Sequence, residues 1–213
     1  MAKLINPFDN LTKMQISKLY DLLDVHIYKY KKYQEVLPTI KNSNIVGIII
    51  NGDVQITRTD YSGNEIIIEE LTENGIFSTN MSRISSSNTQ IVAREDTEVM
   101  VIDYNKLMNP KNLDHRYFNI FFHNVFSIMN EKYKDTNERI QIIEKKQIRD
   151  RLLEYFNINY KKTLSRNIYL PHNLKDLADY IASNRSAMFR ELRNLKDDHF
   201  IEIKGKRITL LYK

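Results

Sequence analysis

The hydrophobic residues of this chain change their spacing near Pro110, and that change dictates the class of fold. From His26 to Ile102 they come in short runs such as "VGIIINGDVQITRTD", in which the Asn51-Gly52 dipeptide is suited to a hairpin turn. After Pro110 the spacing becomes helical and stays so for about thirty residues. We therefore predict an α+β protein in which short antiparallel strands precede a long helix.

Two further segments complete the predicted β-structure. The stretch "YSGNEIIIEELTENGIF" turns at "SGN" into a strand over 65–71, and "TQIVAREDTEVMVIDY" supplies two more strands. Several short strands at close, regular intervals predict a small antiparallel barrel or sandwich. A helix over 11–23, capped by Asn10, precedes the strands.

The long helix carries two apolar stripes. One has spacings that alternate between four and three residues, which is a heptad seam. The other stripe ends at Ile128, whereas the seam continues through the charged stretch "NEKYKDTNERIQ". We therefore predict that the second half of the helix pairs with another copy of the chain to form a homodimer. The alternative is a single helix that buries one broad face at home. The seam consists of Phe122, Phe126, Met129, Tyr133, Thr136, Ile140 and Ile143, and the second stripe of Phe118, Phe121, Val125 and Ile128.

The C-terminal segment predicts two short helices joined by a tight turn. The small residue Ala178 lies where the helices cross, and a second helix over 185–197 buries Met188 and Leu192 while its other side stays polar. These are the requirements of a helix-turn-helix, and the following "HFIEIKGKRITLLYK" predicts the basic hairpin of a winged helix. The predicted DNA-binding residues are Asn184, Arg185, Ser186, Phe189, Arg190, Arg193, Lys204, Lys206 and Arg207.

Charge is distributed unevenly along the chain. Residues 146–213 contain 15 Lys and Arg against 8 Asp and Glu, a net charge of +7, in a chain whose total is +5. The first 145 residues therefore carry a net charge of −2. A basic C-terminal third on a slightly acidic body indicates that this third meets a polyanion.

Several kinds of chemistry are excluded or unsupported. The chain has no cysteine, which excludes disulfides, iron–sulfur clusters and thiolate zinc sites, and its five histidines lack metal-ligand spacing. No catalytic set and no phosphate-binding glycine loop is present, so we expect no enzyme, no metal and no cofactor. The longest apolar run, "NIVGIII", is too short to cross a bilayer, and the N-terminus lacks a secretory signal, so we expect a cytoplasmic protein.

In its order of elements the sequence resembles the Crp/Fnr (catabolite activator) superfamily of bacterial transcription regulators. The stretch "LADYIASNRSAMFRELRNL" is similar to the family's helix-turn-helix pattern, with Arg185 and Arg190 at the positions that point at bases in the family. The resemblance implies an eight-stranded, cyclic-nucleotide-binding-like antiparallel roll of the jelly-roll type over 1–110, a dimerisation helix over 111–145 and a winged helix-turn-helix over 146–213. The implied partners are double-stranded promoter DNA and RNA polymerase.

Three residues of the helix-turn-helix depart from the family pattern. Ala182 replaces the turn glycine, so a residue with a β-carbon must adopt a left-handed or adjusted turn. Ala187 replaces a Ser or Thr, and Ser186 stands where many members carry Glu. The loss of that carboxylate removes an acceptor for a cytosine amine, so the operator sequence does not follow from the family.

The roll lacks the residues by which family members hold cyclic AMP. Thr79 and Asn80 fall where the family has Gly-Glu, and Ser87-Asn88 fall near its Arg-Ser pair. Arg83 is the only cation of the loop and lies at another offset. Without the phosphate arginine and the ribose acceptor, we predict a regulator that cyclic AMP does not gate. A small organic effector, a peptide or no ligand remain open.

Two other functions compete with regulation of transcription. A signalling or scaffold protein would use the roll for a ligand and the C-terminal unit for a protein partner, but it would not need the clustered basic residues. A cupin-type enzyme would need inward His and Glu clusters on the strands, and none occurs between Ile27 and Asp103. The sequence does not decide between activator and repressor.

Overall fold

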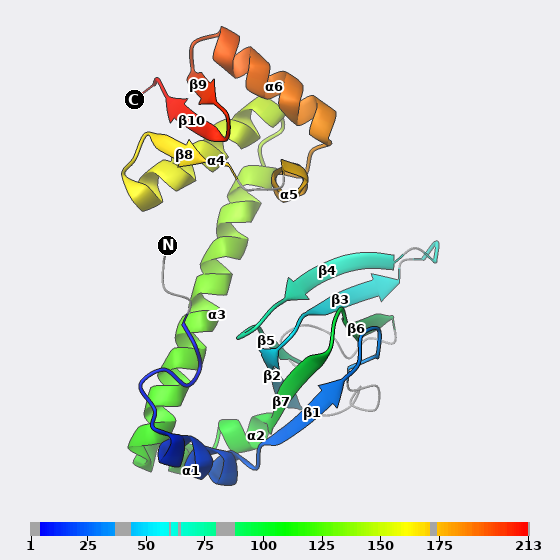
Figure 1. Cartoon of the computed structure of the whole chain (residues 1–213), viewed down its shortest axis with the longest axis vertical. Coiled ribbons are helices and arrows are strands. Elements are labelled where there is room, and N and C mark those ends of the chain that lie inside the picture. The colour runs from blue at the N-terminus through cyan, green and yellow to red at the C-terminus, as the bar shows by residue number, and fades with distance from the viewer. Residues whose placement is uncertain are drawn as a thin grey trace. The chain divides into compact units, whose positions relative to one another are not determined.

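The computed structural model describes residues 5–36, 44–59, 61–63, 65–79, 88–170 and 174–212, without the side chains of 65, 66 and 174–176. The chain divides into two compact units, Met1–Asn130 and Glu131–Lys213 (Figure 1). The long helix α3 (Arg116–Ile143) contributes its first half to one unit and its second half to the other. The resemblance had implied a separate dimerisation helix over 111–145.

The first unit contains a roll of two antiparallel sheets. One sheet has the strand order β1-β7-β2-β5 and the other the order β4-β3-β6. This confirms the predicted antiparallel roll, with seven strands among the described residues. The strands are β1 (His26–Tyr30), β2 (Ile45–Asn51), β3 (Val54–Thr59), β4 (Glu65–Leu71), β5 (Ile76–Ser78), β6 (Thr89–Ala93) and β7 (Thr97–Asp103).

The prediction of a hairpin at Asn51-Gly52 is wrong. Gly52 does take a left-handed φ of 87°, but β2 pairs with β5 and β7, whereas β3 pairs with β4 and β6. The turn therefore leads from one sheet to the other. The reason is that β2 is buried on both faces from Ile45 to Ile49, so it occupies the interior of a sheet and not half of a solvated hairpin. The β3–β4 connection is a hairpin, as predicted.

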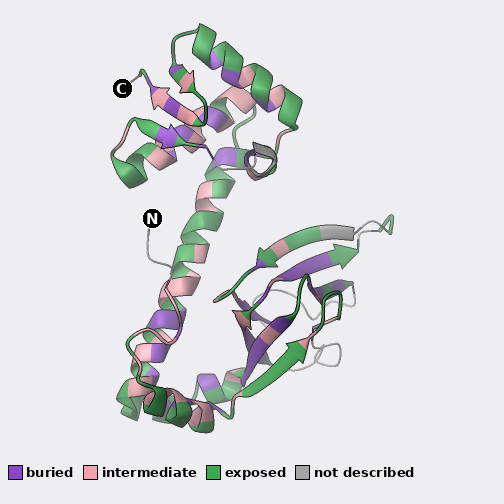
Figure 2. Ribbon diagram, viewed as in Figure 1, coloured by how far each residue is buried: buried purple, intermediate pink, exposed green. Residues whose placement is uncertain are grey.

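Two apolar cores lie on the two faces of β2 and β7. Ile49, Val54 and Phe77 belong to the core between the sheets. Gly47 packs against the Phe77 ring so closely that a β-carbon would lie 2.2 Å from the ring, so only glycine fits. Figure 2 shows the buried residues concentrated on β2, β3 and β7 and the exposed residues along β1.

Helices cover the outer face of the four-stranded sheet. α1 (Lys13–Leu23) and the first half of α3 share a core with β2 and β7. The cap of α1 is Thr12, which forms a capping box with Gln15, and not Asn10 as predicted. The capping box satisfies two helix amides at once, which a lone Asn10 two residues earlier does not. α2 (Tyr104–Leu107) and η1 (Pro110–Asp114) connect β7 to α3.

The second unit packs helices on a small antiparallel sheet of order β8-β10-β9. Its core joins Ile142 of α3 to residues from every other element of the unit. Residues 160–163 form the last turn of α4. No helix among the described residues is long and apolar enough to cross a membrane. The elements are α4 (Ile148–Thr163), β8 (Asn167–Tyr169), α5 (Leu174–Tyr180), α6 (Arg185–Asp197), β9 (Ile201–Lys204) and β10 (Arg207–Leu210).

Candidate nucleic-acid interface

α5 and α6 pack through small and apolar side chains spaced three or four residues apart. Leu177, Ala178 and Ile181 are buried on one side of the contact, and Met188 and Leu192 on the other. Ala178 is 1% exposed, as expected for a small residue where two helices cross. Because the side of α6 with Met188 and Leu192 is buried, the opposite side of the helix is exposed to solvent.

The turn between the helices is a Schellman motif built on alanine. The Ser183 amide donates to the Ala178 carbonyl at 2.8 Å and the Ala182 amide to the Asp179 carbonyl at 3.1 Å. Ala182 has a φ of 51°, so the predicted left-handed turn residue is confirmed. Asn184 then caps α6, because its Oδ1 accepts from the Ala187 amide at 2.7 Å.

Ala182→Gly should stabilise the second unit by about 1 kcal/mol. Glycine adopts a left-handed φ without the steric cost that alanine carries, and Ala182 is exposed, so no packing is lost. Ala187→Gly is the matched control and should destabilise by about 1 kcal/mol, because it lies in the first turn of α6. Urea unfolding followed by circular dichroism measures both changes. If both variants lost the same stability, the left-handed backbone at Ala182 would carry no steric cost for alanine.

The exposed side of α6 carries the predicted contact residues. Arg185, Ser186, Phe189, Arg190 and Arg193 are all exposed. The Arg185 guanidinium lies over the Phe189 ring at 5.5 Å, which orders both side chains. In the described part of the chain no carboxylate forms an ion pair with any of the three arginines, so their charges face solvent.

The predicted wing is the turn between β9 and β10. Gly205 takes a left-handed φ of 62°, and Lys204 and Lys206 on either side of it are exposed. Lys204 Nζ lies 4.0 Å from a Glu202 carboxylate oxygen, so its charge is partly compensated. Arg207 is half-buried, because its backbone lies in β10 between β8 and β9.

Two arginines that the sequence did not single out hold the turn. Arg151 Nη1 donates to the Ala182 carbonyl at 2.7 Å and to the Ile181 carbonyl at 3.3 Å. Arg139, from the end of α3, donates to the Asp179 and Tyr180 carbonyls, each at 3.3 Å. Cations at a helix C-terminus stabilise its unpaired carbonyl groups. In a sequence these residues add only to the positive charge, so no pattern distinguishes them from DNA contacts.

A third arginine fixes the orientation of α6 on α4. Arg149 Nη1 lies 2.8 Å from an Asp198 oxygen and 3.4 Å from a Glu191 oxygen. Its guanidinium also lies 4.9 Å from the centre of the Phe200 ring. The side chain is half-buried, and it joins the start of α4 to the middle and the end of α6.

The heptad seam of α3 leaves large apolar side chains in solvent. Phe126 is 63% exposed, Tyr133 67%, Ile140 41% and Ile143 38%, whereas Ile142 is fully buried. Phe122 and Met129 are half-buried against the core of the first unit, and Thr136 is exposed. Within one chain the seam is therefore uncovered over the second half of the helix. The second stripe behaves as predicted, since Phe118, Phe121 and Val125 are buried and Ile128 packs beside them.

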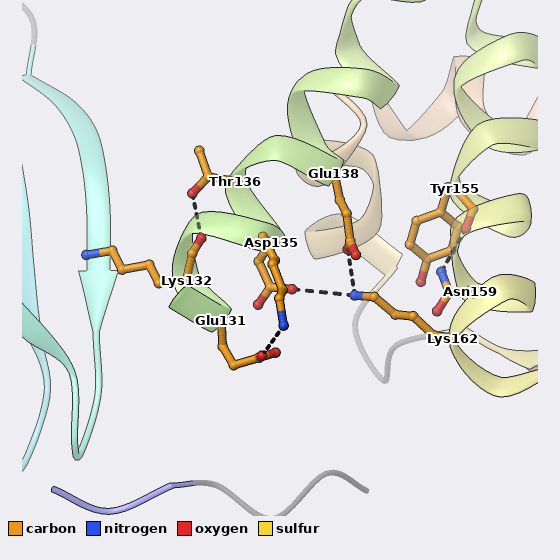
Figure 3. A network of polar contacts seen from close by, with 9 residues as sticks. Glu131, Lys132, Asp135, Thr136, Glu138, Tyr155, Asn159 and Lys162 are labelled. Carbon is orange, nitrogen blue, oxygen red and sulfur yellow. Dashed lines mark hydrogen bonds and ion pairs between the residues drawn. The ribbon is translucent and has the colours of Figure 1, made fainter. Parts of the chain in front are cut away.

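A polar network occupies the other face of α3 (Figure 3). Lys162 of α4 lies 2.5 Å from a Glu138 oxygen and 3.4 Å from an Asp135 oxygen. Burial lowers the pKa of Lys162, but its hydrogen bonds and attraction to Glu138 and Asp135 outweigh burial, so the pKa lies above its usual value. For the neighbouring Tyr155 phenol, burial instead raises the pKa, because it disfavours the charged phenolate. This face of α3 packs against α4, whereas the seam carries the exposed apolar side chains.

Most of the predicted departures from a cyclic-nucleotide site lie outside the described residues. These are Asn80, Arg83 and Ser87. Thr79 is buried, and its Oγ1 accepts from the Ile45 amide at 3.0 Å, which ties the end of β5 to β2. The Asn88 carbonyl accepts from the Thr59 amide at 2.9 Å. Within the described ranges, no group of three or more His, Cys, Asp or Glu side chains is placed to hold a metal ion.

Comparison with known proteins gives a domain match within the roll and the fold of the chain. Residues 29–109 match the family model of the cyclic nucleotide-binding domain. No curated protein sequence matches the chain. The solved structure of CprK complexed with OCPA shares 15% sequence identity, with 92% of this chain and 91% of that chain aligned at a TM-score of 0.61. A double mutant of CooA from Carboxydothermus hydrogenoformans shares 19% identity, with 94% and 93% aligned at a TM-score of 0.56.

These likenesses agree with the order of elements derived above. The roll, the long helix and the C-terminal winged unit of this chain all have counterparts in the solved structures, which align over nearly their whole length. Residues 29–109 therefore match the cyclic nucleotide-binding domain, and the chain as a whole has the fold of these two solved structures.

Proposed function

We propose that the protein is a homodimeric, sequence-specific DNA-binding regulator that reads a pseudo-palindromic operator with α6. The observation that carries the proposal is the exposed side of α6, where Arg185, Arg190 and Arg193 have no carboxylate partner among the described residues. Arginine near the start of a recognition helix can bind guanine O6 and N7 with two hydrogen bonds. Ser186 can contact a base or a phosphate beside it.

The wing supplies the second part of the proposed interface. Exposed Lys204 and Lys206 flank Gly205 at the tip of the β9–β10 turn, the position from which a wing reaches the phosphate backbone. Such contacts strengthen binding to every sequence alike, whereas the α6 side chains distinguish between sequences. Asn184 contributes chiefly by capping α6, since its side chain is engaged with the Ala187 amide.

Selection of bound duplexes from a random pool tests this function. The full chain should enrich an inverted repeat whose half-sites are about one helical turn apart, at moderate salt and with competitor DNA present. If no sequence were enriched and binding depended only on the charge of the competitor, the proposal of sequence-specific recognition would be wrong. Mass spectrometry of molecules that purify with the chain would at the same time identify a bound effector.

The scaffold function is the second candidate, favoured by the exposed Phe189 on α6, which is 39% exposed. An aromatic side chain on a helix is a common anchor for a protein partner. The same selection separates the two functions, because a scaffold would enrich no DNA sequence. The exposed arginines around Phe189 favour DNA binding over binding of a protein partner.

Cyclic AMP and cyclic GMP should not activate this protein. At millimolar concentration neither nucleotide should raise the melting temperature or change the affinity for the selected operator, because the ribose and phosphate contacts of the family are absent from the sequence. Thermal denaturation and fluorescence anisotropy measure the two effects. A clear thermal shift would show that another part of the roll binds the nucleotide.

A further inference from the structure

The second half of α3 has two sides with different surroundings. On one side the seam residues Tyr133, Ile140 and Ile143 are exposed. On the other side Ile142 is fully buried, in a core that it shares with residues of α4, α5 and α6. The stretch of helix that carries the proposed dimer contact is therefore also part of the compact unit that carries α6.

A cation of α3 holds the end of α5. Arg139 donates to the Asp179 and Tyr180 carbonyls, each at 3.3 Å, and its guanidinium lies 5.8 Å from the centre of the Tyr180 ring. The Tyr180 ring also meets Tyr155 of α4 edge-on, with a centroid distance of 6.0 Å. α5 is therefore held to α3 and α4 at the end from which the turn leads to α6.

A cation of α4 forms a second link to the same stretch of α3. Lys162 Nζ lies 2.5 Å from a Glu138 oxygen and 3.4 Å from an Asp135 oxygen, as Figure 3 shows. The Glu138 side chain is only 22% exposed, and salt screens a partly buried pair less than an exposed one. Two charged links and one buried isoleucine thus join α4, α5 and α6 to the helix that carries the seam.

This arrangement bears on the distance between the half-sites of an operator. In a two-fold dimer, the separation and the angle of the two α6 helices depend on how α4, α5 and α6 are oriented on their own α3. One added base pair moves the second half-site by about 3.4 Å and rotates it by about a tenth of a turn. A rigid link therefore penalises every spacing except one, whereas a loose link accepts several.

We propose that Arg139 and Lys162 determine which spacing of half-sites the protein accepts, because they hold α5 and α4 on the helix that carries the seam. This inference rests on the proposed function, a dimer that reads an inverted repeat with α6. Both side chains are engaged within their own chain, so they act as positioning residues and not as contacts with DNA.

Operators with altered spacing test the inference by fluorescence anisotropy. The wild-type chain should bind the selected inverted repeat at least about tenfold more tightly than duplexes with one base pair added or removed between the half-sites. Arg139→Met/Lys162→Met should lower this ratio to about threefold or less, because both charged links are lost while Ile142 keeps the unit attached to α3. The duplexes contain the same two half-sites, so a change in half-site affinity cancels in the ratio.

Lys145→Met/Lys161→Met is the matched control. It removes the same charge from two exposed lysines whose side chains form no ion pair in the part of the chain that the structure describes. Its ratio should stay within about twofold of the wild-type ratio. Sedimentation should show both double variants as dimers, because none of the four side chains belongs to the seam. Dissociation of Arg139→Met/Lys162→Met alone would overturn the inference, since it would assign these side chains to the dimer contact.

The remaining outcomes separate this inference from the function on which it rests. A wild-type chain that enriches no inverted repeat would overturn both. A wild-type chain that selects an inverted repeat but accepts all spacings equally, or a folded Arg139→Met/Lys162→Met that keeps the full ratio, would overturn only the positioning role. If circular dichroism showed that this double variant is unfolded, Lys162→Met alone should still lower the ratio at least about twofold, and an unchanged ratio would overturn the inference.

Discussion

Ile140→Glu should convert the proposed dimer into a monomer at micromolar concentration. The substitution brings two carboxylates together across the two-fold axis of an apolar seam, and burying such charges without partners costs several kcal/mol. A cost of about 3 kcal/mol raises the dissociation constant about a hundredfold. The chain itself should keep its fold, because Ile140 is 41% exposed and lies on the face of α3 opposite the network with Lys162. Sedimentation velocity measures the change.

Gln141→Glu is the matched control for this experiment. Gln141 is exposed and lies beside Ile140 but off the heptad spacing, so it adds the same charge without entering the seam. The control should sediment with the wild type. If Ile140→Glu stayed dimeric while circular dichroism showed a folded chain, or if both variants dissociated equally, the seam would not be the dimer interface.

Arg190→Ala should weaken operator binding by about 1–3 kcal/mol, roughly tenfold to a hundredfold, and relax the preference at one base pair of each half-site. The physical reason is the loss of a bidentate contact with a base from an exposed side chain that no described carboxylate restrains. Fluorescence anisotropy with the selected operator and with duplexes altered at single positions measures both effects.

Lys206→Ala provides the comparison for Arg190→Ala, because its proposed contact is with phosphate. It should weaken all sequences alike and reduce the slope of affinity against salt by about one unit. Arg190→Ala should instead act mainly on the preferred sequence. Unchanged operator affinity in both variants would contradict the assignment of α6 as the recognition helix.

The sequence predicted the parts of the fold that depend on long, regular patterns. The helical period after Pro110, the buried face of α6 and the left-handed Ala182 all follow from spacing or from one missing glycine, and the structure has them. Local turn chemistry was less informative. Asn51-Gly52 fits a hairpin, but β2 is buried on both faces and pairs with β5 and β7, whereas β3 belongs to the other sheet.

The side chains that support the candidate site could not be predicted from the sequence. Arg139, Arg149 and Arg151 act through contacts with residues some 30 to 50 positions away in the chain. Their partners are mostly backbone carbonyls, which every residue has, so no residue type signals the contact.

The stoichiometry of the complex with DNA tests the central claim most directly. Sedimentation of the wild-type chain with the selected full-length operator should give a complex of two chains per duplex, because two recognition helices about 34 Å apart are needed to read both half-sites. A duplex that keeps only one half-site should bind at least about a hundredfold more weakly, since half of the base contacts are lost. One chain per duplex, with equal affinity for the full operator and the half-site, would contradict a dimer that reads a pseudo-palindrome.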